Sequence, residues 1–199
     1  MLSSSAYPST TYAIFFSIAF WAWILFEFWV FFRERGAARD RSSDRGSASL
    51  VIVLLIVGIT AGLNLPQLAP QFNIRSLFPF FFALGIVLVF AGLLFRFWAI
   101  QTLGQFFRTQ VMIQQEHRLI TTGPYTYLRN PSYTAILVLL TGLGLAIGNW
   151  LSAVVLLATG ILAYGLRIAR VEERALAERF GQEFQDYRKK TWALIPFIW

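Results

Sequence analysis

The sequence contains no cysteine and only one histidine, His117. Without cysteine the chain cannot form a disulfide framework, a thiolate zinc site, an iron–sulfur cluster or a cysteine nucleophile. A single histidine leaves little room for a metal cluster built on imidazoles or for a relay of several of them. Charge is scarce as well, because only 14% of the 199 residues are Asp, Glu, Lys or Arg. A soluble domain has roughly 25%, so this composition argues against an ordinary soluble domain.

What replaces the charge is apolar sequence, which makes up 57% of the chain and includes 20 Phe, 7 Trp and 7 Tyr. About 20 apolar residues in a helix cross a bilayer. Five such segments are visible: Tyr12–Phe32, Leu50–Leu68, Leu77–Ile100, Tyr133–Ile147 and Leu151–Leu166. The last two are short and are separated by Gly148-Asn149-Trp150, which predicts a tight helical hairpin. We therefore predict an all-α, polytopic integral membrane protein with about five transmembrane helices, or four if the hairpin is re-entrant.

The net charge of +7 is distributed unevenly along the chain. In a five-span arrangement, 15 of the 17 basic residues fall on one side, within the loop 33–49, the segment 101–132 and the C-terminal region 167–199. Basic loops stay in the cytoplasm during insertion. We predict an N-terminus outside and a C-terminus in the cytoplasm, in the inner or plasma membrane if the source is bacterial.

Two polar segments need a further explanation. Residues 101–132 contain the turn signals Thr122–Tyr125 and Asn130-Pro131, and Pro131 suits the first position of a helix. In the C-terminal region, Gly181 predicts a helix stop. The adjacent Glu172-Glu173 lies directly below the last span, where carboxylates need basic partners such as Arg167 and Arg170. A membrane-surface connector and a solvated charged helix remain the plain alternatives for the two segments.

These observations divide the chain into two parts. Residues 1–100 hold three transmembrane helices and the basic loop. Residues 101–199 form the second half, with a polar loop at 101–132, a helical hairpin at 133–166 and a cytoplasmic C-terminal helix at 167–199.

The second half carries a set of short motifs in a particular order. They are His117-Arg118-Leu119-Ile120, Gly123-Pro124-Tyr125, Arg129-Asn130-Pro131-Ser132-Tyr133, Glu172-Glu173, Leu176, Phe180-Gly181, Phe184, Tyr187 and Ile195-Pro196. This array resembles the isoprenylcysteine carboxyl methyltransferase family over roughly residues 95–198. Many members have histidine where Asn130 stands, and asparagine cannot shuttle a proton.

The resemblance implies a membrane enzyme that uses S-adenosylmethionine in a cytoplasmic pocket. It makes residues 101–199 the catalytic half and the loop 101–132 the cofactor loop. The implied cofactor residues are Gln110, His117, Leu119, Ile120, Tyr125, Asn130, Pro131, Ser132, Tyr133 and Glu172. The implied catalytic residues are Arg167, Arg170 and Glu173, with one arginine holding the acceptor carboxylate. The expected partners are a lipid-like or isoprenylated small-molecule substrate and membrane lipids, with no metal and no nucleic acid.

The residue chemistry agrees with this reading, because a carboxylate acceptor is already ionised at neutral pH and needs no general base. The most direct prediction is methyl transfer to an isoprenylcysteine-like carboxylate. Three alternatives stay open: a phospholipid N-methyltransferase, which requires a base such as His117, a membrane reductase of the sterol-reductase type, and a non-enzymatic membrane protein.

Overall fold

The computed structural model describes residues 7–35, 47–107, 119–167 and 172–197. Every regular element in this part of the chain is a helix, which confirms the all-α prediction. The elements are α1 (Thr10–Arg35), α2 (Ser47–Leu68), α3 (Phe78–Leu103), α4 (Pro131–Ile147), α5 (Trp150–Arg167) and α6 (Glu173–Lys190), with the short 3₁₀ turns η2 (Pro70–Phe72), η3 (Gly104–Phe106) and η4 (Gly123–Thr126).

Four of these helices are long and apolar enough to cross a membrane, judged by length and composition: Thr10–Arg33, Ser49–Leu68, Phe78–Leu103 and Trp150–Arg167. The helix α4 is shorter, with 17 residues, of which 13 are buried. At 1.5 Å per residue it is about 26 Å long, slightly less than the hydrocarbon thickness of a bilayer. The chain is therefore a polytopic membrane protein in which α4 is the central helix.

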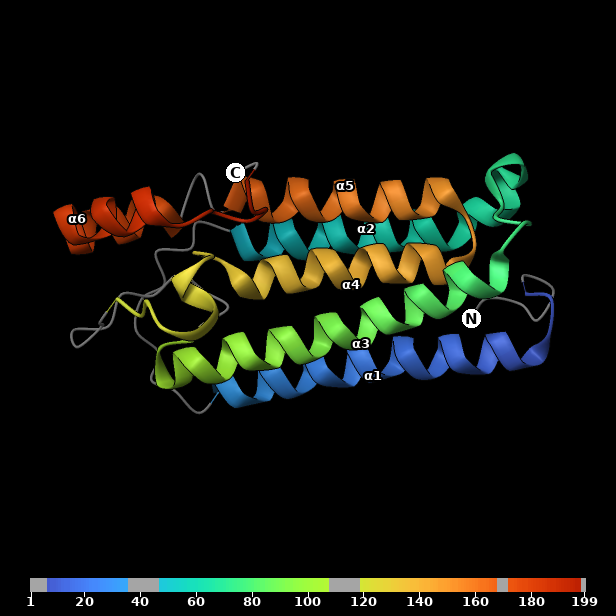
Figure 1. The fold of residues 1–199 in the computed structure, drawn as a ribbon, viewed down its shortest axis with the longest axis horizontal. Coiled ribbons are helices and arrows are strands. Elements are labelled where there is room, and N and C mark those ends of the chain that lie inside the picture. The colour runs from blue at the N-terminus through green and yellow to red at the C-terminus, as the bar shows by residue number, and fades with distance from the viewer. Residues whose placement is uncertain (1–6, 36–46, 108–118, 168–171, 198–199) are drawn as a thin grey trace.

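Figure 1 shows the helices α1 to α5 lying side by side along one common axis. The helix α4 contacts all four other helices of the bundle, most extensively α3 and α5, while α2 packs on α5 and α1 packs on α3. The described part of the N-terminal segment lies at one end of the bundle, and α6 projects beyond the other end (Figure 1). We call the end that carries α6 the α6 end.

Glycines allow α3 and α4 to approach closely. A Cβ atom added at Gly85 would lie 2.6 Å from the carbonyl oxygen of Gly142, and one added at Gly92 would lie 2.8 Å from that of Ala135. Only a hydrogen atom fits at these positions. Membrane helices lack a hydrophobic force that would drive them together, so such close packing supplies much of their association.

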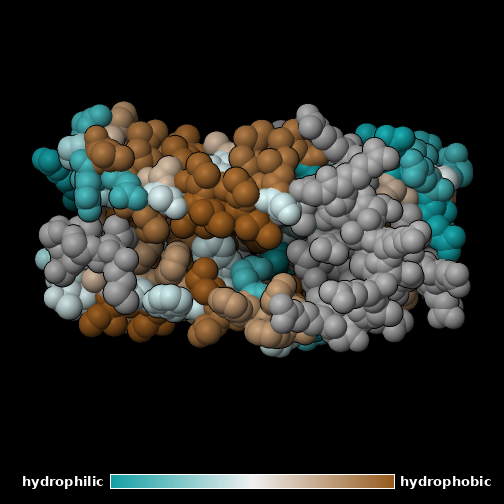
Figure 2. All heavy atoms as spheres, turned by 180° about the vertical axis from the view of Figure 1, so that it is seen from behind, coloured by the Kyte–Doolittle hydropathy of each residue, from teal (hydrophilic) through white to brown (hydrophobic). Residues whose placement is uncertain are grey.

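The surface of the bundle agrees with a lipid environment. Figure 2 shows a broad apolar area over the middle of the molecule and hydrophilic residues toward both ends. Large apolar side chains stay exposed on the outer helices, among them Leu25 at 66% and Leu94 at 71%. A soluble monomer rarely exposes so much contiguous apolar surface.

The predicted hairpin between α4 and α5 is present. Gly148 ends α4 in the left-handed conformation, with φ of 81°, which glycine adopts without strain. The next residue, Asn149, is fully buried, and its Nδ2 donates to Asn73 Oδ1 at 2.7 Å. Its Oδ1 accepts the backbone N–H of Ser152 at 3.0 Å. The hairpin is thereby fastened to the connection between α2 and α3.

At the α6 end, two local predictions are confirmed. The helix α4 begins at Pro131, as predicted. Gly181 interrupts the C-terminal helix, because its φ of 50° and ψ of -120° are not helical, and a second helical stretch follows the kink and ends at Lys190. Glycine adopts a positive φ readily because it has no Cβ atom.

Candidate functional site

The motif residues converge at the α6 end of the bundle. The turn η4, the start of α4, the end of α5 and the start of α6 lie together there (Figure 1). These segments are up to 50 residues apart in the sequence, from Gly123 to Glu173, and each contributes polar side chains to this end.

Glu172 is the centre of the first cluster. The hydroxyl of Tyr133 and the Nε of Arg167 both donate to its Oε1, and the Arg167 distance is 2.9 Å. The Arg167 side chain is only 3% exposed and that of Glu172 is 16% exposed. The ring of Tyr133 stacks on Tyr164 with 4.4 Å between centroids. The predicted pairing of Arg167 with Glu172 is therefore present, and we call these four residues the Glu172 cluster.

Glu173 belongs to a different ion pair. Its Oε1 accepts from Arg129 Nε at 3.0 Å, and its Oε2 lies 3.6 Å from an Arg188 guanidinium nitrogen. Arg129 also donates to the backbone carbonyl of Arg188 at 3.1 Å. Glu173 thus joins both ends of α6 to the loop that precedes α4. The prediction that Glu173 acts in catalysis stays a prediction. Its observed contacts hold α6 against the loop before α4.

A C-terminal strap, residues 191–195, closes over the start of α4. Backbone hydrogen bonds of 2.8 and 3.1 Å join it to the loop before α4. Asn130 Nδ2 donates to the carbonyl of Ala193 at 2.9 Å, and Thr134 Oγ1 donates to that of Leu194 at 2.6 Å. Ala193 and Leu194 are fully buried. The amide of Asn130, predicted to bind the cofactor, is therefore engaged with the strap in this structure.

Tyr125 lies on the other side of the same loop and is 5% exposed. Its hydroxyl points toward α3, 3.5 Å from the carbonyl oxygen of Ala99. Its own carbonyl accepts the hydroxyl of Tyr187 from α6 at 2.7 Å. Burial raises the pKa of Tyr125, and it raises the pKa of Tyr187 to about 12. Both phenols are therefore neutral hydrogen-bonding groups at physiological pH.

Ser132 connects the site to a second buried cluster that sequence reasoning missed. Arg96 of α3 donates to Ser132 Oγ at 2.7 Å and to Glu27 Oε2 of α1 at 2.9 Å. The other oxygen of Glu27 accepts Trp23 Nε1 at 3.2 Å. The available signal was the presence of one acidic and one basic residue in separate apolar segments, because membrane helices bury such charges as pairs. We call these four residues the Arg96 cluster.

The remaining predicted residues divide into two groups. Leu119 and Ile120 are half-buried, and Pro131 is buried at the start of α4. Gln110, His117 and Arg170 lie outside the described residues. Within the described part of the chain, no group of three or more His, Cys, Asp or Glu side chains is arranged to hold a metal ion.

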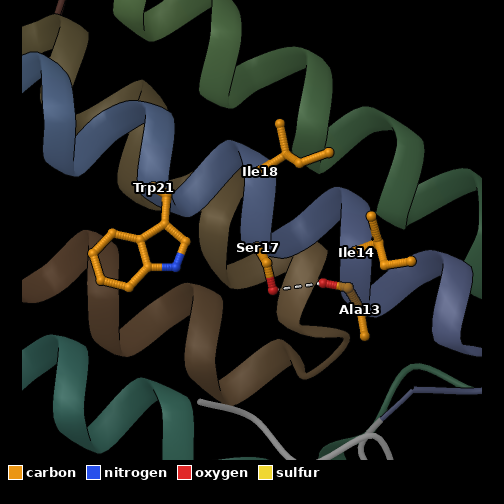
Figure 3. Close-up of a pocket in the computed structure, with 5 residues that line it drawn as sticks. All are labelled: Ala13, Ile14, Ser17, Ile18 and Trp21. Carbon is orange, nitrogen blue, oxygen red and sulfur yellow. Dashed lines mark hydrogen bonds between the residues drawn. The ribbon is translucent and has the colours of Figure 1, made fainter.

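A hollow of about 380 Å³ is found away from this site, on the outer face of α1 (Figure 3). It is lined by Ala13, Ile14, Ser17, Ile18 and Trp21, and the Ser17 hydroxyl donates to the carbonyl of Ala13 in its own helix. No charged side chain lines it, so it offers no group suited to a polar cofactor.

The geometry defines a polytopic α-helical membrane protein with a buried polar site at one end. Residues 83–178 match the model of the isoprenylcysteine carboxyl methyltransferase family. A probable protein-S-isoprenylcysteine O-methyltransferase of Oryza sativa subsp. indica is 34% identical over 116 residues, covering 57% of this chain and 60% of that protein. The protein-S-isoprenylcysteine O-methyltransferase of Saccharomyces cerevisiae is 37% identical over 117 residues, covering 58% of this chain and 48% of its own length.

A solved structure, described as the eukaryotic intramembrane Ras methyltransferase of this family, has the same fold with a TM-score of 0.61 and 24% identity. The match covers 74% of this chain and 52% of that one. The chain thus spans about half the length of the proteins that it matches. Together these comparisons confirm the family resemblance predicted from the motifs.

Proposed function

We propose that this chain is an integral-membrane methyltransferase that transfers a methyl group from S-adenosylmethionine to the carboxylate of an isoprenylcysteine-like acceptor. The observation that carries the proposal is the Glu172 cluster. Its members come from α4, α5 and the start of α6, and all four lie within the segment that matches the family. A buried carboxylate with an aromatic pair beside it suits a cationic cofactor better than it suits a structural core.

The described residues fit S-adenosylmethionine by the chemistry of their side chains. Glu172 supplies a carboxylate for the cofactor's ammonium group, and the stacked rings of Tyr133 and Tyr164 offer a π-face to a cationic sulfur. Half-buried Leu119 and Ile120 provide apolar surface for an adenine ring. When bound, S-adenosylmethionine supplies a methyl group on a sulfonium, whose bond to sulfur breaks as an acceptor oxygen attacks in line.

The chain's own residues then have three tasks: binding, orientation and the exclusion of water. Arg167 and Tyr133 fix the orientation of the Glu172 carboxylate through their hydrogen bonds. The C-terminal strap covers the start of α4 and limits the access of water. No side chain has to remove a proton, because the acceptor carboxylate is ionised at neutral pH. Arg170 is the candidate for holding that carboxylate, since Arg167 is paired with Glu172.

The acceptor is proposed to enter from the bilayer. Figure 2 shows hydrophilic atoms recessed between apolar side chains near the middle of this face, so polar groups lie beside lipid-facing side chains there. An anionic head group on a long apolar tail matches such a boundary. The positions of the basic residues further support an α6 end that faces the cytoplasm.

The test uses the full chain in detergent. Calorimetry with S-adenosylmethionine should give saturable binding, and mass spectrometry should detect a methyl ester on an S-farnesylcysteine whose amine is blocked. Binding without ester formation, together with methylation of phosphatidylethanolamine in vesicles, would indicate an amine acceptor instead. Absence of cofactor binding would overturn the proposal.

A further inference from the structure

Apart from Ser132, the Arg96 cluster lies outside the site predicted from sequence motifs, and half of it lies outside the matched segment. Glu27 and Trp23 are in α1, whereas the family model begins at residue 83. Arg96 is 5% exposed and Glu27 is 32% exposed, so the ion pair is formed at the interface of α1 and α3.

Stability alone does not explain this arrangement. A buried ion pair costs about as much desolvation energy as its attraction returns, and apolar residues often replace it without loss. Arg96 Nε is also buried without a hydrogen-bond partner among the described residues. An unsatisfied buried donor is unfavourable. A helix contact selected only for stability would use apolar side chains here.

The contacts of Arg96 indicate what the pair achieves. One guanidinium nitrogen is fixed by Glu27 at 2.9 Å, and another donates to Ser132 Oγ at 2.7 Å and to the Ser132 carbonyl at 3.4 Å. Because guanidinium is planar and rigid, fixing one nitrogen orients the others. The next residue after Ser132 is Tyr133, whose hydroxyl donates to Glu172. A continuous set of contacts therefore leads from α1 to the Glu172 cluster.

We propose that Glu27 is a positioning residue: its carboxylate holds the Arg96 guanidinium on Ser132 and thereby fixes the first turn of α4, from which Tyr133 reaches Glu172. The inference rests on the proposed cofactor function of the Glu172 cluster. It gives α1 a role in cofactor binding although α1 contributes no residue to the Glu172 cluster itself.

The decisive measurement is the affinity for S-adenosylmethionine, determined by calorimetry on the detergent-solubilised full chain. Glu27→Gln keeps the size of the side chain but removes the charge, and it should weaken binding about tenfold, within the usual range of coupling between distant groups. The melting temperature of the cofactor-free protein should also fall, because Arg96 then stays buried without its counter-charge, so the affinity is measured at a temperature at which both proteins are folded. A purely structural role would lower the melting temperature and leave the affinity of the folded protein unchanged.

A double-mutant cycle shows whether Glu27 acts through Arg96. Arg96→Gln should weaken binding, and Glu27→Gln should add nothing in that background. If the two losses add, Glu27 acts by another route and the inference is wrong. Ser17→Ala is the matched control on α1, because its hydroxyl bonds only within its own helix in the described structure.

Trp23→Phe keeps both charges and removes only the indole N–H that donates to Glu27. It provides a milder variant if Glu27→Gln does not fold, and it should weaken binding in the same direction but less. Wild-type affinity in Trp23→Phe and Glu27→Gln would overturn the inference. A wild-type protein that does not bind S-adenosylmethionine would instead overturn the proposed function, so the two failures are distinguishable.

Discussion

At the scale of single residues, the α6 end gives Glu172 and Glu173 separate basic partners. Glu172 receives an arginine and a tyrosine donor on one oxygen, and Glu173 receives Arg129. Two adjacent carboxylates thus take different surroundings, one inside the bundle and one between α6 and the loop before α4. Adjacent residues on a helix point about 100° apart, so this division follows from helix geometry.

The first prediction concerns the charge of Glu172. Glu172→Gln should weaken S-adenosylmethionine binding by roughly tenfold to a hundredfold, since a hydrogen bond to a charged group contributes about 1.5–3 kcal/mol. Calorimetry on the folded variant measures this. The control is Glu178→Gln, which alters an exposed carboxylate of the same helix, paired with Arg174 at 3.0 Å. Equal affinities of the two variants would contradict a cofactor role for Glu172.

The second prediction separates the two arginines near the end of α5. Arg167→Lys loses the Nε hydrogen bond to Glu172, so it should reduce cofactor affinity, although the charge is retained. Arg170→Lys should leave cofactor affinity nearly unchanged and raise the KM for the acceptor, because a lysine does not make the two parallel hydrogen bonds that guanidinium offers a carboxylate. Steady-state kinetics with each substrate varied in turn checks both. A lower cofactor affinity in Arg170→Lys together with a higher acceptor KM in Arg167→Lys would contradict this assignment. Arg170 would then orient Glu172, and Arg167 would hold the acceptor.

At the scale of helices, the contact between α3 and α4 sets the position of Tyr133 relative to the rest of the bundle. That contact depends on positions where a side chain does not fit. Gly92 faces α4, and its neighbour Ala91 is exposed on the outer surface of the same helix.

The third prediction uses this pair of neighbours. Gly92→Leu should lower the free energy of unfolding by about 1–3 kcal/mol, because added atoms in a packed interface force the helices apart. Ala91→Leu adds a similar side chain to the outer surface and should change stability little. Thermal unfolding in detergent measures both. Similar melting temperatures for the two variants would show that the helices separate without cost.

The helices themselves were predictable from the sequence, because apolar runs and Gly148 determine them locally. The central position of α4 was not predictable, because the sequences of α1, α3 and α4 are all uniformly apolar and do not distinguish a central helix from an outer one. The interruption at Gly181 was predictable, because a glycine permits a positive φ, but the second helical stretch after it was not, since it depends on tertiary contacts such as the burial of Phe184.

The site was only partly predictable, and the distance along the chain explains why. Arg167 and Glu172 are five residues apart, so their pairing could be inferred from sequence. Arg96 is 69 residues from Glu27, and Asn130 is 63 residues from Ala193. No local rule joins such residues, and the motif that contains Asn130 gave no sign that its amide would contact the C-terminal strap.

At the scale of the whole molecule, the two ends of the bundle differ in charge and in structure. The α6 end carries the polar clusters, and the opposite end carries the hairpin that Asn149 fastens to the α2–α3 connection. The described residues of that connection include Arg75, the only basic residue that the five-span arrangement assigns to the opposite side. The positive-inside rule therefore predicts that the basic end faces the cytoplasm.

The last prediction is the orientation in the membrane. Because the five-span arrangement assigns 15 of the 17 basic residues to one side of the membrane, reporter fusions at Gly46 and after Trp199 should report the same, cytoplasmic compartment. A reporter inserted after Arg75 should report the outside and serves as the internal control. Replacing the five arginines of the loop 33–49 with glutamine should weaken this preference, because it removes a third of the basic residues on that side. The five-span arrangement puts an even number of spans between these first two fusions. Opposite compartments would require an odd number and would show that the five-span arrangement is wrong.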